Sequence, residues 1–81
     1  MKKEEIFEIV KNSIVEVLED IDESLISTEV SLKQLGANSI DRVDILIMSM
    51  EKLNLKIKMM EFSEITNIGG IVDLLYTKLN A

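Results

Sequence analysis

The sequence contains no cysteine and no histidine among its 81 residues. Without cysteine the chain can form neither a disulfide framework nor a thiolate metal site. Histidine is the usual general base near neutral pH and a frequent metal ligand, so its absence argues against a self-contained hydrolase. We therefore expect no catalytic residues and no metal site, and any thiol chemistry must come from a group that is added to the chain.

Long apolar runs and a net positive charge are also missing. The longest apolar run is Ile45–Met48, far short of the roughly 20 residues needed to span a bilayer. Lys2 and Lys3 are followed at once by acidic residues, so no secretion signal can be drawn, and we expect a cytoplasmic protein without membrane insertion. The formal net charge of −6 argues against binding nucleic acid through its phosphates.

What the chain has is enough apolar material for one small core. Hydrophobic residues make up 47% of the sequence, too many for a disordered tail, so we expect one folded domain over residues 1–81. The charge is unevenly distributed. Residues 1–29 contain nine acids and three lysines, whereas residues 30–81 contain six acids and six bases. All of the net negative charge therefore lies in the first third of the chain.

Apolar residues recur at helical spacing in three parts of the chain, which predicts an all-α fold. The spacing predicts a first helix over residues 3–20 and a second over residues 39–53. A third is expected from a cap at Thr66 or Asn67 to the end of the chain, with one or two short helical turns over residues 59–65. The pattern is typical of a small antiparallel four-helix bundle with three main helices and one short helix.

Two connecting segments and one helix face complete this prediction. Residues 22–35 have no helical period and should form a long loop. Apolar side chains should anchor this loop and the segment after the second helix to the core, namely Leu25, Ile26, Val30, Leu32, Leu35, Leu55 and Ile57.

The expected buried face of the second helix contains Val43, Leu46, Ile47, Met50 and Leu53. Ile45 and Met48 fall outside that stripe, and Asp41, Asp44 and Lys52 lie opposite it.

The segment Leu35–Val43 joins a glycine turn to the start of the second helix. Gly36 can adopt backbone conformations that other residues resist, and Asn38 is a preferred helix cap, so the helix should begin at about Ser39. Asp41 stands where the acidic half of a capping box stands. Ser39 is therefore expected on the surface, where free N–H groups would suit an esterified phosphate. By itself, the pattern also fits a serine that merely caps a helix.

The run Gly36-Ala37-Asn38-Ser39-Ile40-Asp41 resembles the attachment motif of acyl carrier proteins, Gly-x-Asp-Ser-Leu/Ile-Asp. Residues 57–75 also look like the third and fourth helices of that family, so the resemblance covers nearly the whole chain. In the family, a phosphopantetheinyl transferase moves 4′-phosphopantetheine from coenzyme A to the serine, and the terminal thiol holds an acyl group. The resemblance implies that Ser39 is the attachment residue and that Asp41 helps to engage the transferase.

The same resemblance implies an acyl-sheltering cleft and a docking surface for partner enzymes. The family's cleft lies between the second helix and the later helices, and its lining here would include Val43, Ile47, Ile57, Met59, Ile65 and Leu75. The docking surface would be formed by Ile40, Asp41, Asp44, Met48, Met59 and Met60.

Four positions depart from the pattern of fatty-acid carriers. Asn38 replaces the usual aspartate before the serine, and Lys52 stands where those carriers tend to have an acid. Met59 and Met60 replace acids expected near the third helix. The second helix then sets Asp41, Asp44 and Glu51 against Arg42 and Lys52, which leaves a nearly neutral surface. Docking should therefore depend less on salt and more on apolar fit.

These departures argue against a housekeeping fatty-acid role. The run Gly36–Arg42 is more similar to discrete carriers of polyketide assembly lines, in particular those that accompany β-branching cassettes. There, an acyltransferase and a decarboxylating ketosynthase provide acetyl-carrier from malonyl-carrier, and an enzyme like 3-hydroxy-3-methylglutaryl (HMG) synthase adds the acetyl unit to a polyketide. The resemblance implies the same partners here, with the chain as a monomeric, tethered substrate and not an enzyme.

Two other interpretations stay open from the sequence. One is a different carrier, for fatty-acyl or peptidyl groups. The other is a helical adaptor that is never modified, in which Ser39 only caps its helix. In that case Ile40, Met48, Met59 and Met60 would form a protein-binding patch.

Overall fold

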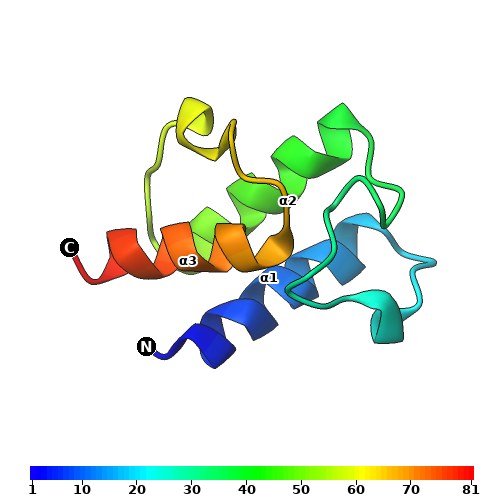
Figure 1. The fold of residues 1–81 in the computed structure, drawn as a ribbon, viewed down its shortest axis with the longest axis horizontal. Coiled ribbons are helices and arrows are strands. Elements are labelled where there is room, and N and C mark those ends of the chain that lie inside the picture. The colour runs from blue at the N-terminus through cyan, green and yellow to red at the C-terminus, as the bar shows by residue number, and fades with distance from the viewer.

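The fold is all-α in a computed structural model that describes all 81 residues. Its elements are α1 (Lys3–Val17), the 3₁₀ turn η1 (Glu23–Leu25), α2 (Ser39–Lys52), the 3₁₀ turn η2 (Met59–Phe62) and α3 (Ile68–Leu79). In Figure 1, α2 and α3 run opposite to α1, and both chain termini lie at the same end. The predicted architecture is confirmed, with the short fourth helix present as η2. None of the helices combines the length and apolar character needed to cross a bilayer.

One core joins the three α-helices and the loops between them. Its fully buried apolar side chains come from every α-helix, and they are Ile6, Val10, Ile14, Ile45, Ile68 and Leu75. Helical spacing predicts that the buried stripe of the first helix consists of Ile6, Val10, Ile14, Val17 and Ile21, and its first three members are fully buried. The helix ends at Val17, earlier than the predicted Asp20. Acidic residues follow there and no basic residue stands in the last turn, an unfavourable arrangement at the negative end of the helix dipole.

The buried face of α2 differs from the prediction. Ile45 is fully buried, whereas Val43 and Ile47 are 42% and 41% exposed, so the predicted face is wrong at all three positions. The helix has apolar residues on two sides, and the stripe that enters the core is interrupted in sequence by Ser49. This serine is fully buried. Its hydroxyl can leave water because it donates a hydrogen bond to the Ile45 carbonyl, 2.8 Å away within the same helix.

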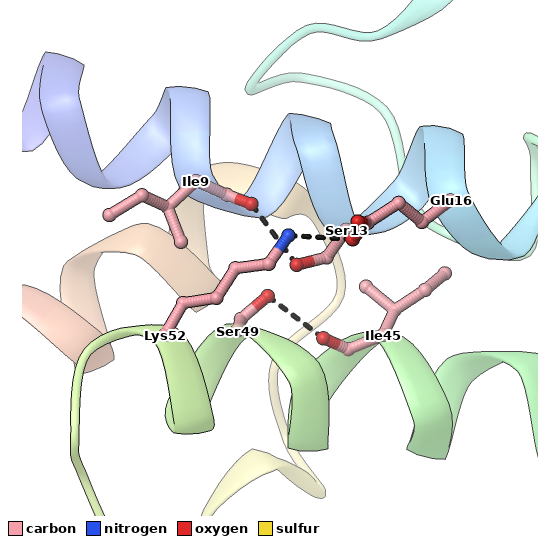
Figure 2. A network of polar contacts seen from close by, with 6 residues as sticks. All are labelled: Ile9, Ser13, Glu16, Ile45, Ser49 and Lys52. Atoms are coloured by element: carbon pink, nitrogen blue, oxygen red, sulfur yellow. Dashed lines mark hydrogen bonds and ion pairs between the residues drawn. The ribbon is translucent and has the colours of Figure 1, made fainter.

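A matching serine lies on the facing helix. Ser13 of α1 is also fully buried, and its hydroxyl donates to the Ile9 carbonyl at 3.1 Å. Figure 2 shows both serines between α1 and α2, where their small side chains allow the two helices to pack closely. Beside them, Lys52 of α2 forms an ion pair with Glu16 of α1 at 2.7 Å. Lys52 therefore joins the two helices, on the side of α2 that faces α1.

The loop between α1 and α2 is anchored on the core and on α3. Ile26 and Leu32 are buried as predicted, but Leu25 is 57% exposed, because the 3₁₀ turn η1 directs it to solvent. The Gly69 N–H of α3 donates to the Thr28 carbonyl at 2.9 Å. A Cβ at Gly69 would lie 3.1 Å from that carbonyl oxygen, so the glycine permits this close approach.

The remaining anchors agree with the prediction. Ile57 is buried, while Val30, Leu35 and Leu55 are half-buried and pack against the core. Asn67 caps α3, with its side-chain oxygen accepting from the Gly70 N–H at 2.8 Å.

Candidate functional site

The turn before α2 has the geometry that its sequence predicts. Gly36 has φ +94°, in the region that favours glycine. Asn38 is the N-cap, and its Oδ1 accepts from the Asp41 N–H at 2.8 Å. In return, the Asn38 N–H donates to Asp41 Oδ2 at 3.2 Å. The capping box and the start of α2 at Ser39 are therefore confirmed, and the turn is held by reciprocal hydrogen bonds.

Ser39 stands exposed at the start of α2. Its Oγ accepts a hydrogen bond from Arg42 Nη2, one turn further along the helix, at 3.2 Å. The N–H groups of Ser39 and Ile40 donate no hydrogen bond within the chain. A phosphate ester at this hydroxyl would thus meet free backbone donors and a guanidinium, both of which favour an anion.

Arg42, the hydrogen-bond partner of this serine, also lines a hollow of about 410 Å³. We name it the Arg42 hollow. Its walls come from the loop before α2, from α2, from η2 and from α3. They include Lys33, Arg42, Leu46, Phe62, Ile65 and Ile71. The hollow is thus bounded by segments far apart in the sequence, and its residue Arg42 stands one helical turn after Ser39.

The residues predicted to line one acyl cleft do not come together. Ile65 lines the Arg42 hollow, whereas Ile47 and Ile57 line a separate hollow of about 460 Å³. Leu75 is fully buried in the core, and Met59 is 37% exposed. The prediction joined these positions because the family's cleft lies between the second helix and the later helices. That resemblance names the elements that border the cleft but does not tell which of their side chains face the same cavity.

Of the residues that line the Arg42 hollow, the predicted cleft contained only Ile65; Lys33, Arg42, Leu46 and Phe62 are among those that it missed. For Arg42 a signal existed. It stands three residues after Ser39, and residues at this spacing are neighbours on a helix surface. For Phe62 the sequence offers no comparable signal, because its position against α2 depends on how η2 packs.

The residues predicted to dock partners differ in exposure. Ile40 and Met60 are 72% and 73% exposed, and Asp44 is exposed as well. Met48 is half-buried, and so is Asp41 within its capping box. The structure adds Val43 and Ile47 to the exposed set. Ile40, Val43 and Ile47 follow one another at helical spacing, and we name these three residues the outer ridge of α2.

An ion pair ties η2 to α3. Lys78 Nζ lies 2.8 Å from Glu61 Oε1. The hydrogen bond from Lys78 is the main reason that the pKa of Glu61 is lowered from its usual value. This contact connects α3 to the turn that carries Met59 and Met60.

Known proteins match both the sequence and the fold. Residues 8–75 match the family model described as phosphopantetheine attachment site. The chain is 41% identical to the polyketide biosynthesis acyl-carrier-protein AcpK of Bacillus subtilis (strain 168), covering 100% of this chain and 99% of that protein. It is 36% identical to an acyl carrier protein of Thermotoga maritima, covering 95% of each.

A solved structure is similar over almost the whole chain. It is the crystal structure of the curacin biosynthetic pathway HMG synthase in complex with acetyl donor-ACP. The matching chain has a TM-score of 0.87 and 36% identity, and the match covers 96% of this chain and 100% of that one. The family model and both relatives cover well over half of the sequence. The chain therefore belongs to the acyl carrier protein family, as a non-catalytic carrier with a phosphopantetheine attachment site.

Proposed function

We propose that Ser39 carries the 4′-phosphopantetheine arm and that the protein carries acyl groups as thioesters in polyketide biosynthesis. The observation that carries this proposal is the exposed Ser39 at the capped start of α2, within a chain that matches the attachment-site family. The full-length similarity to the polyketide carrier AcpK supports the pathway class. A thiol at the end of a long arm supplies the chemistry that a chain without cysteine lacks, and tethering raises the effective concentration of the acyl group for each enzyme.

We propose further that the acyl group is acetyl, formed from malonyl, and that the acceptor enzyme is an HMG-synthase-like β-branching enzyme. The similarity to the acetyl donor carrier of the curacin pathway supports this role. The other partners would be the phosphopantetheinyl transferase, an acyltransferase and a decarboxylating ketosynthase. Asp41, whose carboxylate accepts the Asn38 N–H, would present the turn to the transferase in a fixed conformation.

The docking surface that we propose centres on the outer ridge of α2. Ile40, Val43 and Ile47 are exposed on one side of this helix, although apolar side chains gain by leaving water. The sequence-based candidates Asp44, Met48, Met59 and Met60 complete the proposed surface. Lys52 forms its ion pair with Glu16 on the side of α2 that faces α1, away from the outer ridge, so it does not belong to this surface.

Intact mass after incubation with coenzyme A and a broad-specificity phosphopantetheinyl transferase tests the attachment residue. We expect one added phosphopantetheine on the wild type and on Ser63→Ala, which removes another exposed serine, and none on Ser39→Ala. No addition to the wild type, while a known carrier is modified in the same experiment, would overturn the proposal. The unmodified adaptor would then be the leading interpretation.

A reconstituted acetyl transfer tests the donor role. The acetyl-loaded protein and an acetyl-loaded fatty-acid carrier are offered separately to the HMG-synthase-like enzyme. We expect faster transfer from this protein. Equal transfer from both carriers would contradict the specific donor role and would leave the general carrier function standing.

The location, the domain extent and the oligomeric state are proposals as well. We propose a cytoplasmic monomer in which residues 1–81 form one carrier domain. Light scattering after size exclusion should then give a mass near 9.2 kDa for the unmodified protein. A mass of twice that value would contradict the monomer.

A further inference from the structure

The Arg42 hollow contrasts in charge with the rest of the molecule. The chain contains 15 acidic and nine basic residues. Nevertheless, the hollow is lined by the cations Lys33 and Arg42 and by no carboxylate. The three ion pairs of the structure use Lys3, Lys52 and Lys78, so neither cation of the hollow is neutralised by an acid. Two unpaired positive charges around a concave surface attract an anion.

The position of the hollow suggests which anion reaches it. Arg42 Nη2 already donates to Ser39 Oγ at 3.2 Å, and this oxygen would become the ester oxygen of the arm. A phosphodiester at Ser39 would place its charged oxygens within reach of the same guanidinium. The lining also includes the polar residues Ser31, Ser63, Thr66 and Asn67. Ser31 Oγ accepts from the Gln34 N–H, the Ser63 hydroxyl donates to the Met60 carbonyl, and Asn67 Oδ1 accepts from the Gly70 N–H. The Ser31 and Thr66 hydroxyl protons and the Asn67 side-chain N–H groups are left to hydrogen-bond the amides and hydroxyl of a pantetheine chain.

We propose that the Arg42 hollow binds anionic groups of the loaded arm, and that it thereby favours an acyl group with a free carboxylate. Arg42 contacts the phosphodiester at the base of the arm. When the arm folds back into the hollow, a dicarboxylic acyl group such as malonyl places its terminal carboxylate near Lys33 and Arg42. An acetyl group has no charge to place there. This inference rests on the attachment of the arm to Ser39.

The proposed preference has a consequence for the order of events. On the decarboxylating ketosynthase, the bond between the methylene carbon and the carboxyl carbon breaks. Carbon dioxide leaves, and the electron pair that stays on the methylene carbon takes a proton from water to give acetyl. The step removes the charge that the hollow recognises. The malonyl arm is therefore held against the carrier, and the acetyl arm is freed for transfer.

Thermal unfolding of four forms of the protein tests this inference. The forms are apo, holo, acetyl and malonyl, each verified by intact mass, and the variants are Arg42→Gln and Lys33→Gln. Lys56→Gln removes an exposed lysine that lines a different hollow and is the matched control. We expect the malonyl form to unfold roughly 2–6 °C above the acetyl form in the wild type and in Lys56→Gln. This difference should be lost in Arg42→Gln, reduced in Lys33→Gln, and smaller in high salt.

The four forms also separate the two sources of the anion. If Arg42→Gln removes the difference in unfolding temperature between the holo and apo forms, the bound anion is the phosphodiester. If it removes the difference between the malonyl and acetyl forms, the bound anion is the terminal carboxylate. Equal midpoints for the malonyl and acetyl forms would overturn the acyl preference. Differences in unfolding temperature that persist in both Arg42→Gln and Lys33→Gln would overturn the anion site itself. Failure of the wild type to gain the arm would instead overturn the proposed attachment at Ser39, and this inference with it.

Discussion

The two stripes of α2 that contain apolar residues differ both in composition and in what covers them. The inner stripe of Ile45, Ser49 and Leu53 is buried against the rest of the chain, and it includes a serine. The outer ridge of Ile40, Val43 and Ile47 consists entirely of β-branched apolar residues, and the chain leaves it exposed. The more apolar stripe is thus the one left in water. On this helix, hydrophobicity alone does not distinguish the side that folds the protein from the side available to a partner.

Steric fit accounts for the choice between the two stripes. Ser13 and Ser49 face each other where α1 and α2 meet, and each hydroxyl is satisfied within its own helix (Figure 2). A helix side with a small residue at that point can approach its neighbour, while a side with only large branched residues cannot. The outer ridge is then free for an interaction between molecules.

The largest contrast is expected from truncating one isoleucine in each stripe. Ile45→Ala should lower the free energy of unfolding by about 2–4 kcal/mol, because it leaves a cavity at a fully buried position. Ile47→Ala should lower it by less than about 1 kcal/mol, because that side chain is already 41% exposed. Urea denaturation of both variants measures the difference. Equal losses would mean that the two stripes do not differ in burial.

The start of the site could be predicted from sequence because its determinants are local. The capping box of Asn38 and Asp41 and the turn at Gly36 involve residues within six positions of one another. The buried face of α2 could not be predicted, since it depends on where Ser13 of another helix lies. The Arg42 hollow likewise needs residues between 31 and 71 to meet, and a pattern read along one helix carries no such information.

The second-largest effect is expected at the serine that separates the stripes. Ser49→Leu makes the inner stripe fully apolar, but it should destabilise the protein by about 1–3 kcal/mol, because the facing helix leaves no room for the larger side chain. Ser49→Ala keeps the size and removes the hydroxyl, and it should change stability by about 1 kcal/mol or less, since the hydroxyl bonds only within its own helix. Denaturation curves for both variants check the steric argument. A stabilising Ser49→Leu would contradict it.

A charge on the outer ridge should affect a partner more than the fold. Ile47→Glu is expected to lower kcat/KM for acyl transfer to the partner enzyme by about tenfold, equivalent to about 1.4 kcal/mol of lost docking energy. Its unfolding midpoint should stay close to that of the wild type. Leu25→Glu makes the same exchange at another exposed apolar residue, in η1, and should leave transfer unchanged. Equal losses in both variants would point to a general effect of charge and would remove the ridge as a docking surface.

The smallest effect is expected from acid, at the turn that carries Met59 and Met60. The Lys78 hydrogen bond lowers the pKa of Glu61 in the folded state, so the ion pair stabilises the fold at neutral pH. That contribution is lost as the pH falls through the ordinary glutamate pKa of 4.5 and then through the lower pKa of the folded state. The thermal midpoint of the wild type should therefore decrease between pH 6 and pH 3 slightly more than that of Glu61→Gln. Glu64→Gln removes an exposed acid that forms no ion pair, so its midpoint should decrease as much as that of the wild type. If the midpoint of Glu61→Gln decreases by the same amount, the ion pair does not stabilise η2.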